Sequence, residues 1–370
     1  MSQRSKIGGP ARRQRRVPHH LLFPLALLYG ALVLPLWLGG AAADVFRHGH
    51  ELLFGYALLM AAGFLVTRGG PVLLVALIGA WGLGRLALLA PTAIAALPAG
   101  LLFPLLLLWR AGRPLWRGAK RPENRILPLL LLLLFGLDAL WWLGAFLERP
   151  LPQHRALLGA LDLFTLMMLL VAGRVLPAAL GGYLERRGIA RHDDRRRAWE
   201  LPLAGVMAFQ LLADLSGLEA AAGLAALAAA GLAAARARAW QLGYTRRRPD
   251  LWPLALGYLW LPAGLALKGM AQLAGMLPPA HALHALTVGA LGTLTLVMSA
   301  RTARLQRHLP LQRPSLVGPA VILMGLAALV RLAAVPGVAG GEILLWSAAA
   351  GWSAALLAGL WLQWQAARER

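Results

Sequence analysis

The chain has 370 residues, of which 59% are hydrophobic and only 14% are charged, and its mean hydropathy is +0.63. This composition excludes a soluble protein with a water-facing surface. Basic residues number 37 against 15 acidic ones, which gives a formal charge of +22. The absence of cysteine excludes disulfides, thiolate zinc sites, iron–sulfur clusters and covalently attached c-type haem, so any metal must be held by His, Met or carboxylate side chains.

Apolar windows follow one another along almost the whole chain. A membrane-spanning helix needs about 20 mainly apolar residues. Windows that meet this requirement run over 20–40, 48–67, 71–90, 93–109, 126–147, 155–180, 198–216, 218–236, 251–276, 280–300, 315–336 and 342–364. We therefore predict an all-α membrane protein, a bundle of about 12 transmembrane helices, with a basic leader at 1–19, a single transmembrane domain at 20–366 and a tail at 367–370. The first window lacks a small-residue cleavage motif and is not interpreted as a removable signal peptide.

The distribution of basic residues tests this count independently. Cytoplasmic connections collect Arg and Lys, and thirty of the 37 basic residues lie in the leader, the tail and the even-numbered connections, against three in the odd-numbered ones. The pattern predicts that both termini lie in the cytoplasm and that the protein is a multi-pass protein of the bacterial inner membrane. The same pattern explains the excess of positive charge by the orientation of the protein in the membrane. The predicted partner is therefore the lipid bilayer and not nucleic acid.

Histidines mark the outer side of the predicted bundle. His48, His50 and Glu51 open the second window, where the positive end of the helix dipole keeps an imidazole neutral, the form that binds metal. Residues two apart on a helix point about 200° away from each other, so His48 and His50 would share a metal only if the first turn were extended. Two solvated interfacial side chains are the simpler interpretation of this segment alone.

The tenth window opens with a second pair of histidines. Pro278 and Pro279 set the start of a helix, and His281 and His284, three residues apart, lie on one face of its first turn. Helix starts with histidines on the same side of the membrane predict a site for haem or copper, since haem needs only one or two imidazoles and copper accepts them readily.

Charged residues within the windows point to the same region. A buried charge in a membrane costs at least about 2.5 kcal/mol unless it is paired, so these side chains should face the bundle interior. Arg85 and Arg331 could bind the propionates of a haem, or could pair with acids for structural reasons alone. The acids within the windows are Glu51, Asp138, Asp162 and Asp214. Arg174, near the inner end of its window, is expected to extend toward lipid phosphate.

Three segments resemble the NnrS family of bacterial membrane proteins, which is associated with the response to nitric oxide and with haem and copper. HGHELLFGYALLMAAGFLVT, which contains His48, His50 and Glu51, is similar to the family's first motif. AGRVLP resembles a second motif, and LHALTVGALGTLTLVMSAR resembles a third and most specific one. The motif residues are Gly173, Arg174 and Pro177 in the second segment and His284, Thr287, Gly289, Gly292, Thr293 and Arg301 in the third.

The chain departs from the family pattern at three expected histidines. Trp142, Ala255 and Gln306 stand at those positions. If they hold one of the family's metals, this member has lost that site, and the resemblance then implies one haem b or one copper and not both together.

Two functions of different classes follow. The first is a haem- or copper-binding membrane protein that contributes to tolerance of nitric oxide or nitrosylated species, with His48, His50, His284 and His281 as ligands, and with Glu51, Arg85, Arg331, Asp138 and Asp162 as supporting charge partners. Binding or electron transfer would need no catalytic base, so enzymatic activity is left open. The alternative is a metal-free transporter or channel in which the charged residues line a path. A divergent member that serves only as a structural partner in a respiratory or denitrification complex is a third option.

Overall fold

The computed structural model describes residues 18–41, 44–120, 122–190, 196–275, 277–311, 316–335, 337 and 340–369. Within these ranges the chain forms helices joined by turns and has no β-strand, so the predicted all-α class is confirmed. Most of the predicted leader at 1–19 lies outside the described residues. The elements are α1 (His19–Leu36), η1 (Trp37–Ala41), α2 (Val45–His50), η2 (Glu51–Ala57), α3 (Leu58–Leu65), α4 (Pro71–Ala87), α5 (Ala96–Leu107), η3 (Leu108–Gly112), α6 (Arg113–Gly118), η4 (Pro122–Arg125), α7 (Ile126–Phe146), α8 (Pro150–Glu185), α9 (Arg196–Ser216), α10 (Glu219–Arg238), η5 (Leu242–Arg247), α11 (Trp252–Ala274), α12 (Pro279–His284), η6 (Ala285–Gly292), α13 (Thr293–Leu305), α14 (Val317–Ala333) and α15 (Gly341–Arg368).

Eight helical stretches of the described chain are long and apolar enough to cross a membrane. They are His19–Gly40, Ile126–Phe146, Pro150–Glu185, Ala198–Ser216, Glu219–Arg238, Trp252–Ala274, Pro279–Leu305 and Gly341–Arg368. Two further apolar helices, Pro71–Ala87 and Val317–Ala333, are shorter, and the predicted windows at 48–67 and 93–109 coincide with helices interrupted by π-helical segments. A multi-pass arrangement follows from the eight stretches, while the count of 12 crossings stays a prediction.

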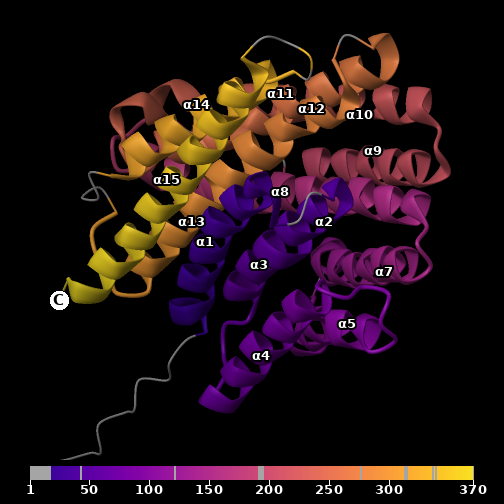
Figure 1. Cartoon of the computed structure of the whole chain (residues 1–370). Coiled ribbons are helices and arrows are strands. Elements are labelled where there is room, and N and C mark those ends of the chain that lie inside the picture. The colour runs from indigo at the N-terminus through magenta and orange to yellow at the C-terminus, as the bar shows by residue number, and fades with distance from the viewer. Residues whose placement is uncertain are drawn as a thin grey trace, which may run out of the picture.

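Helix α8 is the central element of the bundle. Its 36 residues extend about 54 Å, well beyond the roughly 30 Å hydrocarbon layer. The most apolar window of α8 is 83% buried, compared with 33% for the first apolar stretch, so α8 lies among other helices while α1 is more exposed on one side. In Figure 1, α8 lies near the middle of the molecule, beside α9.

Proline and aspartate define several helix starts. Pro71, Pro150 and Pro279 each occupy the first turn, where the missing N–H has no helical partner to lose. Asp44 caps α2, because its carboxylate accepts a hydrogen bond from the Phe46 N–H at 2.9 Å. The α2 cap is therefore Asp44 and neither of the nearby histidines.

The first and last helices pack antiparallel. The indole Nε1 of Trp352 on α15 donates to the carbonyl of Gly30 at 2.8 Å, and the Ser353 hydroxyl donates to the carbonyl of Ala31 at 2.7 Å. Further toward the C-terminus, Gly359 of α15 lies against Leu27 of α1. The start of α1 and the C-terminal end of α15 therefore lie on the same side of the bundle (Figure 1).

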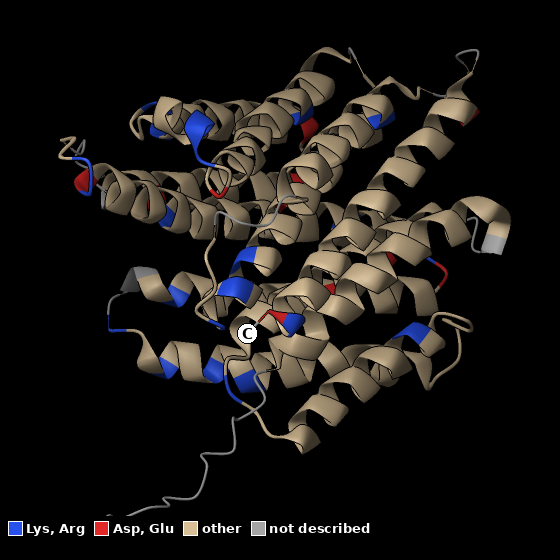
Figure 2. Cartoon of the chain, turned by 90° about the vertical axis from the view of Figure 1, so that its left-hand side faces the viewer, with Lys and Arg blue, Asp and Glu red and all other residues tan. Residues whose placement is uncertain are grey.

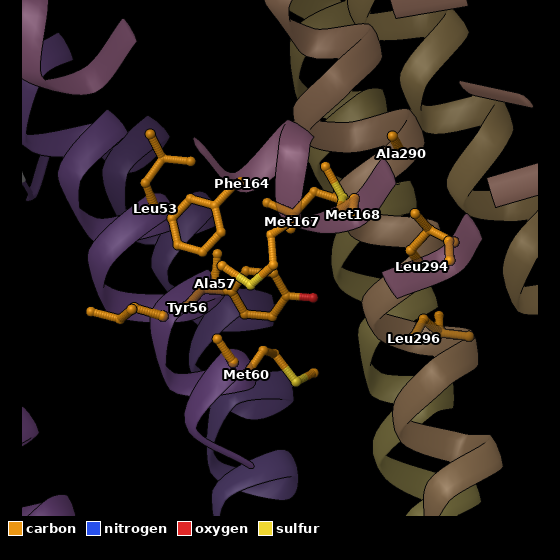
Figure 3. Close-up of a cluster of buried hydrophobic side chains, with 14 of the residues drawn as sticks. Leu53, Tyr56, Ala57, Met60, Phe164, Met167, Met168, Ala290, Leu294 and Leu296 are labelled. Carbon is orange, nitrogen blue, oxygen red and sulfur yellow. The ribbon is translucent and has the colours of Figure 1, made fainter. Parts of the chain in front are cut away.

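The core is filled by Leu, Ala, Met and aromatic side chains. Figure 3 shows Met167 and Met168 of α8 between the η2–α3 segment and the helix that carries Leu294 and Leu296. Tyr56 points its hydroxyl toward that last helix and forms a 2.6 Å hydrogen bond with Thr295. Unbranched methionines fill irregular gaps between helices of different tilt.

The outer surface of the bundle is strongly apolar. Side chains of α4 such as Val72 (82% exposed) and Val75 (71% exposed) would face water in a soluble protein, but face lipid in a membrane. Figure 2 shows that most of the ribbon carries no charge and that Lys and Arg are more numerous along it than Asp and Glu.

Candidate functional site

A cavity of about 380 Å³ is formed where the ends of several helices converge. Its walls come from α1–η1, α2–η2, α8, α12–η6, α14 and α15, and most of the lining side chains are apolar. Four histidines and one arginine also line it: His48, His154, His281, His284 and Arg331. All five lie at helix ends that the charge distribution predicts to be on the outer side of the membrane. The volume is typical of a small-molecule or cofactor site.

His284 presents a free ring nitrogen in this cavity. Its Nδ1–H donates to the carbonyl of Ala280, one turn earlier, at 2.8 Å. The carbonyl can only accept, so in the neutral ring the proton is on Nδ1 and the lone pair is on Nε2. A backbone hydrogen bond that fixes the tautomer and the ring orientation is typical of histidines that bind metals.

His281 lies one turn before His284, with ring centroids 6.3 Å apart. Its Nε2–H donates to the carbonyl of Ala334, beyond the end of α14, at 2.9 Å, and its Nδ1 is buried with no hydrogen-bond partner in the described structure. An unpaired buried nitrogen is costly. His281 therefore links α12 to the end of α14 and keeps one nitrogen available.

His48 and His50 point to different places, as regular helical geometry requires. His48 lines the cavity and lies against the indole of Trp37, with ring centroids 4.2 Å apart. His50 is fully buried outside the cavity lining, and its Nε2–H donates to Asp138 at 2.8 Å. Of this pair, only His48 shares the cavity with His284.

The surroundings of His50 are filled by aromatic rings. It stacks on Trp141 at a centroid distance of 3.9 Å and meets Trp142 edge-on at 5.4 Å. Trp142 is one of the three positions where the family resemblance predicts a histidine, so that missing histidine would have faced His50. The indole instead fills the space against Gly100 of α5.

Glu51 and Arg85 form an ion pair next to this group. Arg85 Nη1 lies 2.6 Å from Glu51 Oε2, and the hydroxyl of Tyr29 donates to the same carboxylate oxygen. The predicted charge partners Arg85 and Glu51 are thus partners of each other. Asp138 pairs with His50, so neither acid lines the cavity.

Both histidine segments are followed at once by a π-helical segment. Glu51–Ala57 continues α2, and Ala285–Gly292 continues α12. The π-helical turns are wider than α-helical ones and occur preferentially at functional sites. They contribute Tyr56 and Thr287 to the cavity wall.

Asp162 belongs to a separate buried cluster. The ammonium group of Lys268 on α11 lies 2.6 Å from Asp162 on α8 and 2.6 Å from Asp214 on α9. Gln210 donates to Asp162 and Gln272 donates to Asp214. Asp162 was predicted as a charge partner of the metal site, but it pairs with Lys268 in this cluster and does not line the cavity.

The second family motif is explained by a further buried ion cluster. A side chain at Gly173 would overlap the guanidinium of Arg236, which is fully buried and donates to the carbonyl of Gly173 at 2.9 Å. Arg174 pairs with Glu200 through two hydrogen bonds of 2.8 and 2.9 Å, and this corrects the expectation that it extends to lipid phosphate. Pro177 continues the same helix without a cis bond. Arg236 and Glu200 were missed from the sequence because they lie far from the motif along the chain.

The third family motif serves mainly close packing. A side chain at Gly289 would overlap Trp260, and one at Gly292 would overlap Trp352. Thr293 is fully buried against Gly257, while Arg301 approaches Asp250 at 3.9 Å. His284 and Thr287 are the members of this motif that line the cavity.

Two other predicted histidine positions lie outside the cavity lining. Ala255 is buried in α11, and Gln306 follows the end of α13 on the exposed surface. His154, which no motif singles out, is a lining residue that sequence reasoning did not select. Its position directly before the window at 155–180, at an end predicted to lie on the outer side, was the one available signal.

Apolar helices that cross a membrane several times, together with a histidine-lined cavity at one end, define a multi-pass α-helical membrane protein. A protein-family model described as "NnrS protein" matches residues 14–369, nearly the whole chain. The chain therefore belongs to the NnrS family, as its three motifs predicted. No curated protein matches it.

Proposed function

We propose that this protein binds one haem b in the histidine-lined cavity and contributes to nitric oxide tolerance in the bacterial inner membrane. The observation that carries the proposal is that His48 and His284, from the second and tenth predicted windows, line one cavity, with Nε2 of His284 unprotonated in the neutral ring. Family membership supports the link to nitric oxide.

The residues present fit a haem. His284 would hold the iron through Nε2, and His48 is the second imidazole of the cavity. Arg331 has one hydrogen bond in the described structure, a 3.4 Å contact with the carbonyl of Ala334, and is free to pair with a propionate. The mostly apolar lining of the cavity suits a porphyrin ring. When bound, the iron supplies a site at which nitric oxide can bind, and the protein tunes it through ligand, polarity and access.

A copper site fits the geometry less well. Copper in proteins is commonly held by a compact set of several donors. Among the described residues, no group of three or more His, Asp or Glu side chains is arranged to hold a metal ion. A flat cofactor that needs one or two imidazoles is compatible with the wider spacing of the cavity histidines.

The transport alternative has less support. A charged path through the membrane would need ionisable side chains along a continuous cavity. The buried charges instead pair with one another in separate clusters around Glu51, Asp162 and Glu200, and the cavity lining includes no acidic side chain among the described residues.

Optical spectroscopy of matched variants tests the proposal. Detergent-purified protein, reconstituted with haem b, is expected to show a Soret band that shifts on addition of nitric oxide. His284→Asn should lower haem occupancy at least about tenfold, because the ligand nitrogen is lost. His308→Asn is the matched control, since His308 is exposed and its left-handed backbone (φ 57°) is one that Asn adopts.

The variant His50→Asn tests whether His50 belongs to the site, as the sequence pattern predicts, or lies outside it, as its position in the structure indicates. This variant should keep the Soret band, because His50 pairs with Asp138 outside the cavity lining. Loss of the band in His50→Asn but not in His284→Asn would contradict the proposed site. A cell lacking the protein should regain resistance to a nitric oxide donor with the wild type and not with His284→Asn.

A further inference from the structure

A second cavity, of about 940 Å³, lies at the opposite ends of the helices and is strongly basic. It is bounded by the end of α3 and the following turn, by η3 and α6, and by parts of η4, α7 and α8. Five arginines line it: Arg68, Arg110, Arg113, Arg117 and Arg174. The first four come from two connections that the charge distribution places in the cytoplasm, so the fold gathers two cytoplasmic connections around one pocket.

Four of these arginines have no acidic partner within the described part of the chain. Arg68, Arg110, Arg113 and Arg117 are exposed and have no ion pair with an acidic residue in the described part of the chain. Arg174 at the pocket wall is satisfied by Glu200. A concave surface lined by several like charges concentrates counter-ions, so the pocket is an anion site by its electrostatics.

The chemistry of the lining favours phosphate. The planar guanidinium group donates two parallel hydrogen bonds to phosphate oxygens, and the pocket adds the polar side chains of Thr67 and Asn124. Its volume can hold more than one phosphate group.

The rim of the pocket favours an amphiphilic ligand over a free ion. Trp109 lines the pocket and is 54% exposed, with the guanidinium of Arg110 5.5 Å from its ring centroid. Trp116, 49% exposed, lies on α6 under Arg125. Exposed tryptophans next to arginines are typical of the level where headgroups meet acyl chains.

From these observations we infer that the pocket binds the headgroup of an anionic phospholipid, with a preference for a diphosphate lipid of the cardiolipin type. Basic pockets between helices on the cytoplasmic side are suited to such headgroups. The site is separate from the histidine-lined cavity and does not depend on haem binding.

Lipid titration of a matched pair of variants tests this inference. Delipidated protein in detergent is titrated with cardiolipin, phosphatidylglycerol and phosphatidylcholine, with thermal stabilisation and native mass spectrometry as readouts. Arg110→Gln/Arg113→Gln/Arg117→Gln should weaken cardiolipin binding at least about tenfold. The control, Arg238→Gln/Arg246→Gln/Arg247→Gln, removes equal charge from exposed arginines outside the pocket and should change binding less than twofold.

Three results would overturn the inference. Equal weakening by both triple variants would show unspecific attraction, and unchanged binding by the pocket variant would show that lipid binds elsewhere. Equal stabilisation by millimolar inorganic pyrophosphate and by cardiolipin would assign the pocket to a free anion. If the pocket variant does not fold, cross-linking of the wild-type protein with photoactivatable cardiolipin tests the inference instead. Cross-links should concentrate at residues 109–119 and not at residues 238–247.

Discussion

Lys268 illustrates how single residues make this bundle stable. Its side chain is 2% exposed, and its ammonium group lies between Asp162 and Asp214, on two other helices. A lone buried charge is expensive in a membrane, but one ammonium group shared by two carboxylates offsets part of that cost and joins three helices. The same reasoning applies to Arg236, which is fully buried and lies 3.8 Å from Glu200.

Lys268→Met should destabilise the protein by about 3–5 kcal/mol, because two carboxylates would remain buried without a cation. Thermal unfolding in detergent measures the loss. The triple variant Asp162→Asn/Asp214→Asn/Lys268→Met should recover most of the stability, since replacement of a whole buried ion cluster is often neutral. If Lys268→Met were as stable as the wild type, the prediction would be contradicted, and water would have to solvate the two carboxylates.

Two elements change their helical geometry where the cavity histidines are placed. Helices α2 and α12 are short and regular, and each continues as a π-helical segment, η2 or η6. The regular turn orients His48 or His284, and the wider turns that follow shape the wall with Tyr56 and Thr287. The shape of the cavity therefore depends on where each α-helix changes to a π-helical segment, and not only on the types of the lining residues.

Packing between α5 and α7 depends on one small residue. A methyl group at Gly100 would overlap the buried ring of Trp142, so Gly100→Ala should cost about 1–3 kcal/mol. Gly136→Ala on α7 is the matched control, because no atom other than its chain neighbours and the backbone of its own helix lies within 4 Å of the added methyl group. This variant should be neutral or slightly stabilising. The melting temperatures of the two purified variants measure both effects. Equal melting temperatures for Gly100→Ala and Gly136→Ala would contradict a tight contact between Gly100 and Trp142.

At the scale of the whole molecule, the bundle has two distinct ends. Histidines and Arg331 surround the cavity at one end, and the arginine pocket lies at the other. The antiparallel pairing of α1 with α15 places both described ends of the chain on one side. The basic connections predict that this side is cytoplasmic.

Reporter fusions test the orientation. A green fluorescent protein fused after Arg370 should fluoresce, and alkaline phosphatase at the same place should be inactive, because the C-terminus is expected in the cytoplasm. A phosphatase inserted at Gly217, in the turn between α9 and α10, should be active. The reverse result at both positions would invert the topology and place the histidine-lined cavity on the cytoplasmic side.

Patterning along the chain was sufficient for the helical class, the membrane environment, the family and the general region of the candidate site. Long apolar windows and the alternation of basic connections are local properties, and His284 with its motif is a contiguous signal. The partners of the buried charges were not accessible in this way, because Lys268 and Asp162 belong to different helices that only packing brings together. Likewise, the assignment of His48 to the cavity and His50 to Asp138 depends on which neighbours surround each face of α2. Only the tertiary structure determines these contacts, because side chains that are distant in the sequence approach one another when the helices pack. Which pairs form depends on the relative positions of the helices and not on the spacing of residues along one helix.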